Sequence, residues 1–131
     1  MVGREENVVY LDTHVVIWLY DALTDRLSST ARSAIEQNDV RIAWVVKLEV
    51  QYLYEIGRVR VPAETVVESL SRSIGLRLSG VPCGEIVQRA LEMEWTRDVF
   101  DRLIAAESEV TASGLVTKDA RMKQNLETAI W

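Results

Sequence analysis

Four acidic residues of the chain could bring carboxylates together around a cation. Asp12 and Asp119 each follow a short apolar run, while Glu49 and Asp101 lie in stretches with helical periodicity. Taken singly, each acid has an ordinary explanation as a helix cap, a turn residue or a solvated charge. Clustered carboxylates repel one another, however, and such a cluster usually persists because a metal ion neutralises it. The chemistry open to such a site is metal-assisted hydrolysis.

Glu49 is the acid that most needs a partner. The periodicity from Val46 to Ile56 predicts a helix, ended by Gly57, in which Glu49 shares the apolar face with Tyr52 and Leu53. It is the only charge on that face. A carboxylate there is costly unless it is paired, protonated or coordinated.

Asp98 and Asp101 lie at the start of another predicted helix. Asp98 occupies the expected N-cap position and Asp101 the first turn, where the helix dipole favours a carboxylate. An ion pair between Asp98 and Arg102 is expected from their spacing. The predicted buried face consists of Val99, Leu103, Ala106 and Val110, and Gly114 is the predicted stop.

Predicted strands alternate with predicted helices along the chain. Strands are expected over 7–11, 40–44, 76–79, 115–117 and 128–131, and helices over 13–20, 28–37, 46–56, 63–74, 84–93 and from 98. This alternation predicts an α/β fold with a central parallel sheet of four or five strands flanked by helices.

The sheet determines which acids could meet. Ligands of parallel sheets bind beyond the carboxyl ends of the strands, and Asp12 and Asp119 each follow a predicted strand directly. Glu49 lies within about a turn of another strand end, and the helix carrying Asp101 starts at the same edge. An all-oxygen set there favours a hard cation, Mg2+ or Mn2+, over zinc. We therefore expect Asp12, Glu49, Asp101 and Asp119 to be metal-binding and catalytic residues.

Length and composition predict one folded domain over residues 1–131. The chain is 48% hydrophobic and 27% charged, and it has only two prolines and six glycines. The net charge of −5 does not exclude a nucleic-acid partner, because bound divalent cations can reverse the sign of one cleft.

The single cysteine, Cys83, cannot form an internal disulfide, and the polar start lacks the apolar core of a signal peptide. A reducing, cytoplasmic setting and a buried or half-buried structural thiol are expected. The longest apolar run, Val15 to Tyr20, is too short to cross a bilayer, so no membrane association is expected.

Other polar and aromatic residues near these acids receive weaker assignments. Thr13 and Thr117 could hydrogen-bond the carboxylates or a metal-bound water, or serve as ordinary cap and strand residues. His14, a lone histidine at a helix start, is assigned no role, and Lys118 is expected to be a solvated surface charge. The four tryptophans, Trp18, Trp44, Trp95 and Trp131, are expected in the core or in interfaces rather than as base-stacking platforms.

Four segments in this order resemble the PIN-domain ribonucleases, and most of all the VapC-type toxins of bacterial toxin–antitoxin pairs. They are Val-Val-Tyr-Leu-Asp12-Thr13, Val-Lys-Leu-Glu49-Val, Arg-Asp98-Val-Phe-Asp101-Arg102-Leu-Ile-Ala-Ala and Leu-Val-Thr117-Lys118-Asp119. Two positions depart from the family pattern: Val99 stands where a proline is common, and a serine often found before Glu49 is missing.

The resemblance implies a three-layer PIN-like domain and a role for each matching residue. Asp12, Glu49, Asp101 and Asp119 match the family's metal-binding acids, and Asp98 matches a supporting or capping acid. The implied activity is Mg2+- or Mn2+-dependent hydrolysis of RNA in single-stranded or loop regions. The implied partners are a small antitoxin whose C-terminal segment covers the acidic cleft and a second copy of the toxin.

Two alternatives stay open on the sequence. A haloacid-dehalogenase-like phosphatase would also have an aspartate after its first strand, but it needs a second acid two residues later, where this chain has His14. The other alternative is a PIN-like module that binds partners and has lost catalysis. The intact acids argue against it.

Overall fold

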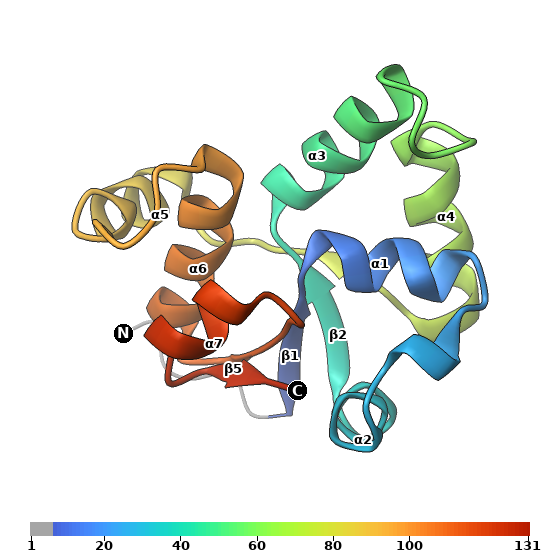
Figure 1. The fold of residues 1–131 in the computed structure, drawn as a ribbon, viewed down its shortest axis with the longest axis horizontal. Coiled ribbons are helices and arrows are strands. Elements are labelled where there is room, and N and C mark those ends of the chain that lie inside the picture. Colours follow the sequence, from blue (N-terminus) through green and yellow to red (C-terminus); the bar gives the residue numbers. More distant parts are fainter. Residues whose placement is uncertain (1–6) are drawn as a thin grey trace.

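The computed structural model describes residues 7–131, and its core is one sheet of five parallel strands. The strand order is β3-β2-β1-β4-β5, so the first strand lies at the centre (Figure 1). The strands are β1 Val8–Leu11, β2 Asp39–Ile42, β3 Arg77–Leu78, β4 Gly114–Val116 and β5 Ala129–Ile130. The predicted parallel sheet is confirmed. The polar start at residues 1–6, where no signal peptide is expected, lies outside the described residues.

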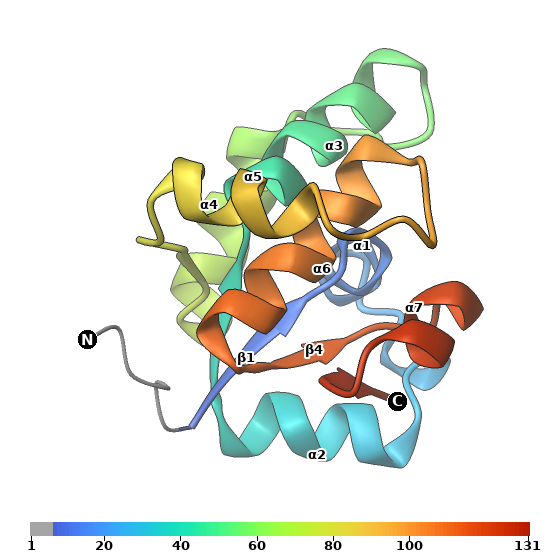
Figure 2. The same cartoon turned by 90° about the vertical axis from the view of Figure 1, so that its left-hand side faces the viewer.

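Helices cover both faces of this sheet. They are α1 Thr13–Tyr20, α2 Ser29–Gln37, α3 Trp44–Glu55, α4 Ala63–Ile74, α5 Cys83–Ala90, α6 Val99–Thr111 and α7 Ala120–Asn125, with a short 3₁₀ helix at Thr24–Arg26. Figure 2 shows α5 and α6 above β1 and β4, and α2 below them. Because both faces are covered, β1 is buried along its whole length. No helix within residues 7–131 is long and apolar enough to span a bilayer.

Several helix ends lie where local sequence signals predict them. Ser28 caps α2 by accepting a hydrogen bond from the Ala31 N–H at 3.0 Å, and Asp98 caps α6 in the same way from the Asp101 N–H at 3.0 Å. Gly75 ends α4 with a φ of +72°.

Other boundaries differ from the prediction. The strand predicted over 40–44 stops at Ile42, and Trp44 is already the first residue of α3. The Trp44 indole N–H donates to the Ser79 carbonyl at 2.9 Å, so the ring lies against the chain that follows β3. The short helix α7 is not among the predicted helices.

The predicted end and buried face of α6 are wrong in part. Ala112, in the left-handed region at φ 51°, closes the helix, and Gly114 belongs to β4. Val99 is 67% exposed, whereas the buried residues of α6 begin at Ile104. The first turn of α6 carries residues of the acidic cavity described below, so it is not packed over the core. Cys83 is also exposed, contrary to the prediction.

A buried carboxyl group lies within the core. Glu107 of α6 is only 2% exposed, and hydrogen bonds connect it with Ser79 and Tyr10. The Tyr10 hydroxyl also donates to Ser79 Oγ at 3.1 Å. Glu107 Oε2 has no hydrogen-bond partner within the described part of the chain. Burial accordingly raises the pKa of Glu107.

Candidate functional site

Asp12 lies directly after β1, at the carboxyl edge of the sheet. Its backbone N–H donates to the Val116 carbonyl at 3.0 Å, which fastens it to the end of β4. Its carboxylate accepts from the Thr13 N–H at 2.8 Å and from the Thr117 hydroxyl at 2.6 Å. Asp12 is 7% exposed, and this burial raises its pKa although both hydrogen bonds lower it. A buried carboxylate with so few donors has room for a further cationic partner.

Asp119 lies one strand away, at the end of β4. It caps α7 by accepting from the Met122 N–H at 2.9 Å, and its own N–H donates to Thr117 Oγ1 at 3.1 Å. Thr117 therefore contacts both Asp12 and Asp119. The two strand-end acids, which the sequence predicts to meet, are held by one threonine between them.

Glu49 reaches the same edge from α3. The Thr13 hydroxyl donates to Glu49 Oε1 at 2.5 Å, so the residue after Asp12 holds this carboxylate. Burial raises the pKa of Glu49, and the charges of Asp12 and Asp98 raise it further. Thr13 therefore donates a hydrogen bond to a carboxylate, which is one of the roles predicted for it.

Asp101 approaches from the first turn of α6. Helices α3 and α6 meet here, with the Tyr52 and Phe100 rings 6.2 Å apart. Burial raises the pKa of Asp101 to about 7, and the charges of Asp98, Asp12, Asp119 and Glu49 contribute in that order. Asp101 thus lies within the electrostatic reach of all the other acids at this edge.

These acids line one cavity of about 320 Å³. Its walls are formed by Asp12, His14, Val15, Trp18, Glu49, Asp98, Asp101, Lys118 and Asp119. All five predicted acids are present, from four different parts of the chain, while Thr13 and Thr117 hydrogen-bond Glu49 and Asp12. The acids therefore lie together at the carboxyl edge of the sheet, as the sequence predicts.

The donor set suits a hard divalent ion that keeps part of its water. Among residues 7–131, no three His, Cys, Asp or Glu side chains converge closely enough to enclose an ion by themselves. Mg2+ seldom requires such a cage, since it commonly binds through one or two carboxylates, several waters and the substrate phosphate. The carboxylates fit that mode of binding, with Asp12 and Asp119 as the pair joined through Thr117.

Three further residues that line the cavity are not predicted from the sequence to belong to it. The sequence assigns none to His14, favours the core or an interface for Trp18, and indicates only a surface charge for Lys118. The spacing of His14 and Trp18 places both on one face of the helix that Asp12 caps, and this is the signal that could have identified them. The predicted pair of Asp98 with Arg102 is wrong, because the Arg102 guanidinium donates to the Ala90 carbonyl at 2.9 and 3.2 Å.

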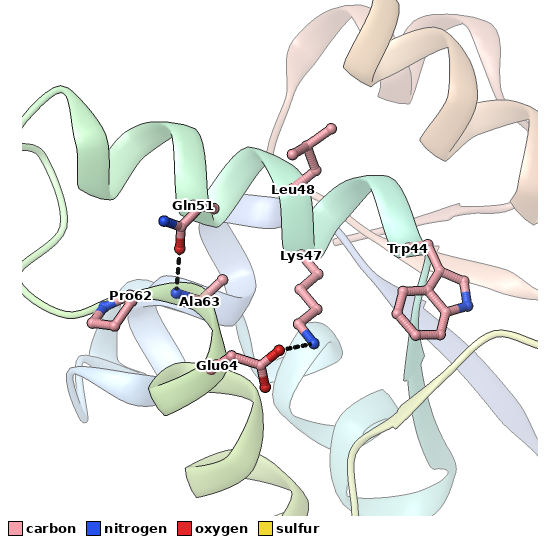
Figure 3. A pocket seen from close by; sticks show the side chains of 7 residues that line it. All are labelled: Trp44, Lys47, Leu48, Gln51, Pro62, Ala63 and Glu64. Carbon is pink, nitrogen blue, oxygen red and sulfur yellow. Dashed lines mark hydrogen bonds and ion pairs between the residues drawn. The ribbon is translucent and has the colours of Figure 1, made fainter.

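A second, larger hollow of about 520 Å³ lies between α3 and α4, apart from the acids. Figure 3 shows its lining, in which Lys47 pairs with Glu64 at 2.6 Å and the Gln51 side-chain carbonyl accepts from the Ala63 N–H at 3.0 Å. Trp44, at its margin, is 58% exposed. Its one carboxylate is already paired, so this hollow offers no counterpart to the acidic cavity.

The comparison with protein families decides the assignment. A family model described as the PIN domain matches residues 9–125, which include every acid of the cavity. The chain belongs to the PIN-domain family. Ribonuclease VapC22 from Mycobacterium tuberculosis is 32% identical to this PIN domain over 123 residues, covering 91% of this chain and 92% of that protein.

Solved structures show the same fold at lower identity. VapBC2 from Rickettsia felis, bound to a DNA fragment from its promoter, matches this PIN domain with a TM-score of 0.61 and 17% identity over 89% of this chain and 92% of that one. A toxin–antitoxin complex from Klebsiella pneumoniae matches with a TM-score of 0.64 and 16% identity over 94% and 96%. VapBC-1 from Haemophilus influenzae matches with a TM-score of 0.58 and 16% identity over 89% and 90%.

Proposed function

We propose that this PIN domain is a metal-dependent ribonuclease and the toxin of a toxin–antitoxin pair. The observation that carries the proposal is that five acids line one cavity at the carboxyl edge of the sheet. The identity with a named ribonuclease over most of both chains supports it, and PIN-domain ribonucleases in general use a divalent metal. The family match leaves no support for the phosphatase alternative.

The cavity residues divide the work between holding an ion and handling protons. Asp12 and Asp119 would hold Mg2+ or Mn2+, and Glu49 and Asp101 would complete its environment directly or through water. When bound, the ion lowers the pKa of a water and offsets charge on the phosphate and the leaving oxygen. No nucleophilic side chain is then needed.

Asp101 or Glu49, the two acids outside the pair joined through Thr117, would take the proton of the attacking water. A bound cation beside these two carboxylates favours their ionised form, which is the form that accepts a proton. Asp98 would keep Asp101 in place by capping α6, while Thr13 and Thr117 orient Glu49 and Asp12. These three residues act by positioning the acids Asp101, Glu49 and Asp12 rather than by contacting the substrate.

We further propose RNA as the substrate, a cognate antitoxin and a second copy of the chain as partners, and a cytoplasmic setting. An antitoxin segment covering the acidic cavity would need positive charge to complement its carboxylates. Residues 1–131 would act as a single PIN-like domain.

A cleavage assay separates this function from its alternatives. Purified protein is incubated with single-stranded RNA and, separately, with a small phosphomonoester, in Mg2+ or Mn2+, then with a chelator, then with the ion restored. The proposal predicts RNA cleavage that disappears with chelation and returns with the ion. Release of phosphate from the monoester alone would identify a phosphatase, and inactivity on both substrates would identify a binding module.

A further inference from the structure

Aromatic side chains stand beside the acids in the cavity. His14 and Trp18, one turn apart on α1, both line it, with ring centroids 6.1 Å apart and planes tilted by 48°. His14 is exposed and Trp18 is half-buried. Trp18 packs in part against the core, whereas the exposed His14 ring does not belong to it.

A third aromatic ring lies beside Trp18 without lining the cavity. The ring of Trp131 lies 6.2 Å from that of Trp18 at 58°, and the exposed guanidinium of Arg26 lies 6.0 Å from the Trp18 centroid. Lys118 lines the cavity itself. Three rings and two cations therefore lie in the cavity or next to it.

An RNA strand entering this cavity would need a source of binding energy other than its phosphates. The lining contains five carboxylates and one lysine, so it repels a phosphate chain before an ion is bound. Stacking of a base on an aromatic side chain does not depend on that charge and is worth about 1–3 kcal/mol per base. Aromatic rings and arginine are the groups on which proteins stack single-stranded bases.

We propose that His14 and Trp18 form a stacking subsite for one base of single-stranded RNA adjoining the cleaved phosphate, with Trp131 supporting the Trp18 ring and Lys118 and Arg26 contacting the neighbouring phosphates. This inference rests on the proposed ribonuclease function and deepens it. The cavity of about 320 Å³ is at the small end of ligand pockets, which suits one nucleotide. A base inside a duplex is stacked on its neighbours on both faces, so the subsite selects unpaired RNA.

Kinetics of matched variants test the subsite. His14→Ala removes an exposed ring, Trp18→Leu removes the central one, and Trp18→Phe restores a ring in its place. We expect His14→Ala and Trp18→Leu to raise KM roughly tenfold with little change in kcat, and Trp18→Phe to recover most of the loss. Trp44→Leu, at the hollow between α3 and α4, is the control and should leave KM unchanged.

A modified substrate makes the test specific to a base. The RNA is prepared with one abasic nucleotide placed in turn on either side of the cleaved bond. At one position the missing base should raise KM of the wild type but not of Trp18→Leu or His14→Ala, because those variants have already lost the stacking partner. A merely structural role of Trp18 would leave the two losses additive.

A binding measurement distinguishes the stacking subsite from the ribonuclease proposal. In the Asp119→Asn background, RNA should quench tryptophan emission, and the quenching should shrink in Trp18→Leu while it persists in Trp44→Leu. Absence of cleavage by the wild type would overturn the ribonuclease proposal alone. Equal KM and equal quenching in all variants, with no effect of the abasic position, would overturn the stacking subsite even if the protein cleaves RNA.

Discussion

Three acids of the cavity also cap helices. Asp12, Asp98 and Asp119 each accept a hydrogen bond from a backbone N–H at the start of α1, α6 or α7. The structural and chemical explanations of these residues are compatible, because a cap uses only one lone pair of one carboxylate oxygen. In Asp12 the second oxygen accepts from the Thr117 hydroxyl and still has a lone pair for a cation. Asparagine also caps helices well, so an Asp→Asn change removes the charge while keeping the cap.

Glu49→Gln tests whether Glu49 serves the ion or the fold. Arg102, the arginine that could have neutralised it, is bound to the Ala90 carbonyl instead, and Glu49 is held by the Thr13 hydroxyl. We expect the variant to lose most of its cleavage activity and to bind Mn2+ more weakly, with an unchanged or higher metal-free melting temperature.

The opposite outcome for Glu49 is equally well defined. If the carboxylate neutralises a buried cation, Glu49→Gln would destabilise the metal-free protein by roughly 3 kcal/mol or more. A large drop in the metal-free melting temperature, with cleavage retained in the folded fraction, would remove Glu49 from the site.

Glu107→Gln should flatten the pH dependence of stability. Because burial raises the pKa of Glu107 above its usual 4.5, the folded state holds this proton more tightly than the unfolded state does. Its contribution to stability is fully present below about pH 4.5 and is lost as the pH rises through the raised pKa. Denaturant unfolding across this range should show a shallower decline in the variant, and the exposed Glu36→Gln should match the wild type. Identical slopes in all three proteins would contradict a raised pKa.

Local sequence signals predict those helix ends that are determined by neighbouring residues. Ser28, Asp98 and Gly75 act through hydrogen bonds or dihedral angles within a few residues, and all three ends are confirmed. Helix α7 has six residues, of which only Met122 is buried, so no apolar period indicates it. The exposure of Val99 depends on how far α6 extends past the sheet, which sequence periodicity does not contain.

Ala112→Gly should stabilise the protein. Ala112 closes α6 at φ 51°, a conformation that costs an L-residue roughly 1–2 kcal/mol and costs glycine almost nothing. After the larger chain entropy of glycine is subtracted, a gain of about 0.5 kcal/mol in the free energy of unfolding is expected. The matched control is Ala34→Gly inside α2, which should lose about 1 kcal/mol. A loss of stability in both variants on denaturant unfolding would contradict this account of the helix end.

At the scale of the whole molecule, the acidic cavity joins separate parts of the chain. The rule that parallel strands end at one edge is sufficient, with the sequence alone, to bring together Asp12, Asp119, Glu49 and Asp101. It does not predict that the Trp18 ring lies beside these acids, because that position depends on the packing of α1 against the last residues of the chain. For this reason the sequence indicates only a core or interface position for Trp18 and Trp131.

The metal-free protein should lose stability as the pH rises. Burial and mutual repulsion raise the pKa of Asp12, Glu49 and Asp101, that of Asp101 to about 7, so ionisation of these groups costs more in the folded state than in the unfolded state. Their contribution is fully present below about pH 4 and is lost as the pH rises through about 7. Mg2+ or Mn2+ should therefore raise the melting temperature more at about pH 8 than at about pH 5. A thermal scan that is independent of both ions at either pH would count against a cation site.

The central claim is that the carboxylates at the carboxyl edge of the sheet hold the ion that drives RNA cleavage. The most direct measurement compares Mn2+-dependent cleavage rates of Asp12→Asn and Asp119→Asn with that of Asp39→Asn, an exposed aspartate at the start of β2 on the opposite edge. The account predicts that all three variants fold. The kcat of Asp12→Asn and of Asp119→Asn should fall roughly a hundredfold or more, because an ionic ligand supplies several kcal/mol of transition-state stabilisation. The kcat of Asp39→Asn should be unchanged. Wild-type rates in both Asp12→Asn and Asp119→Asn would contradict the central claim.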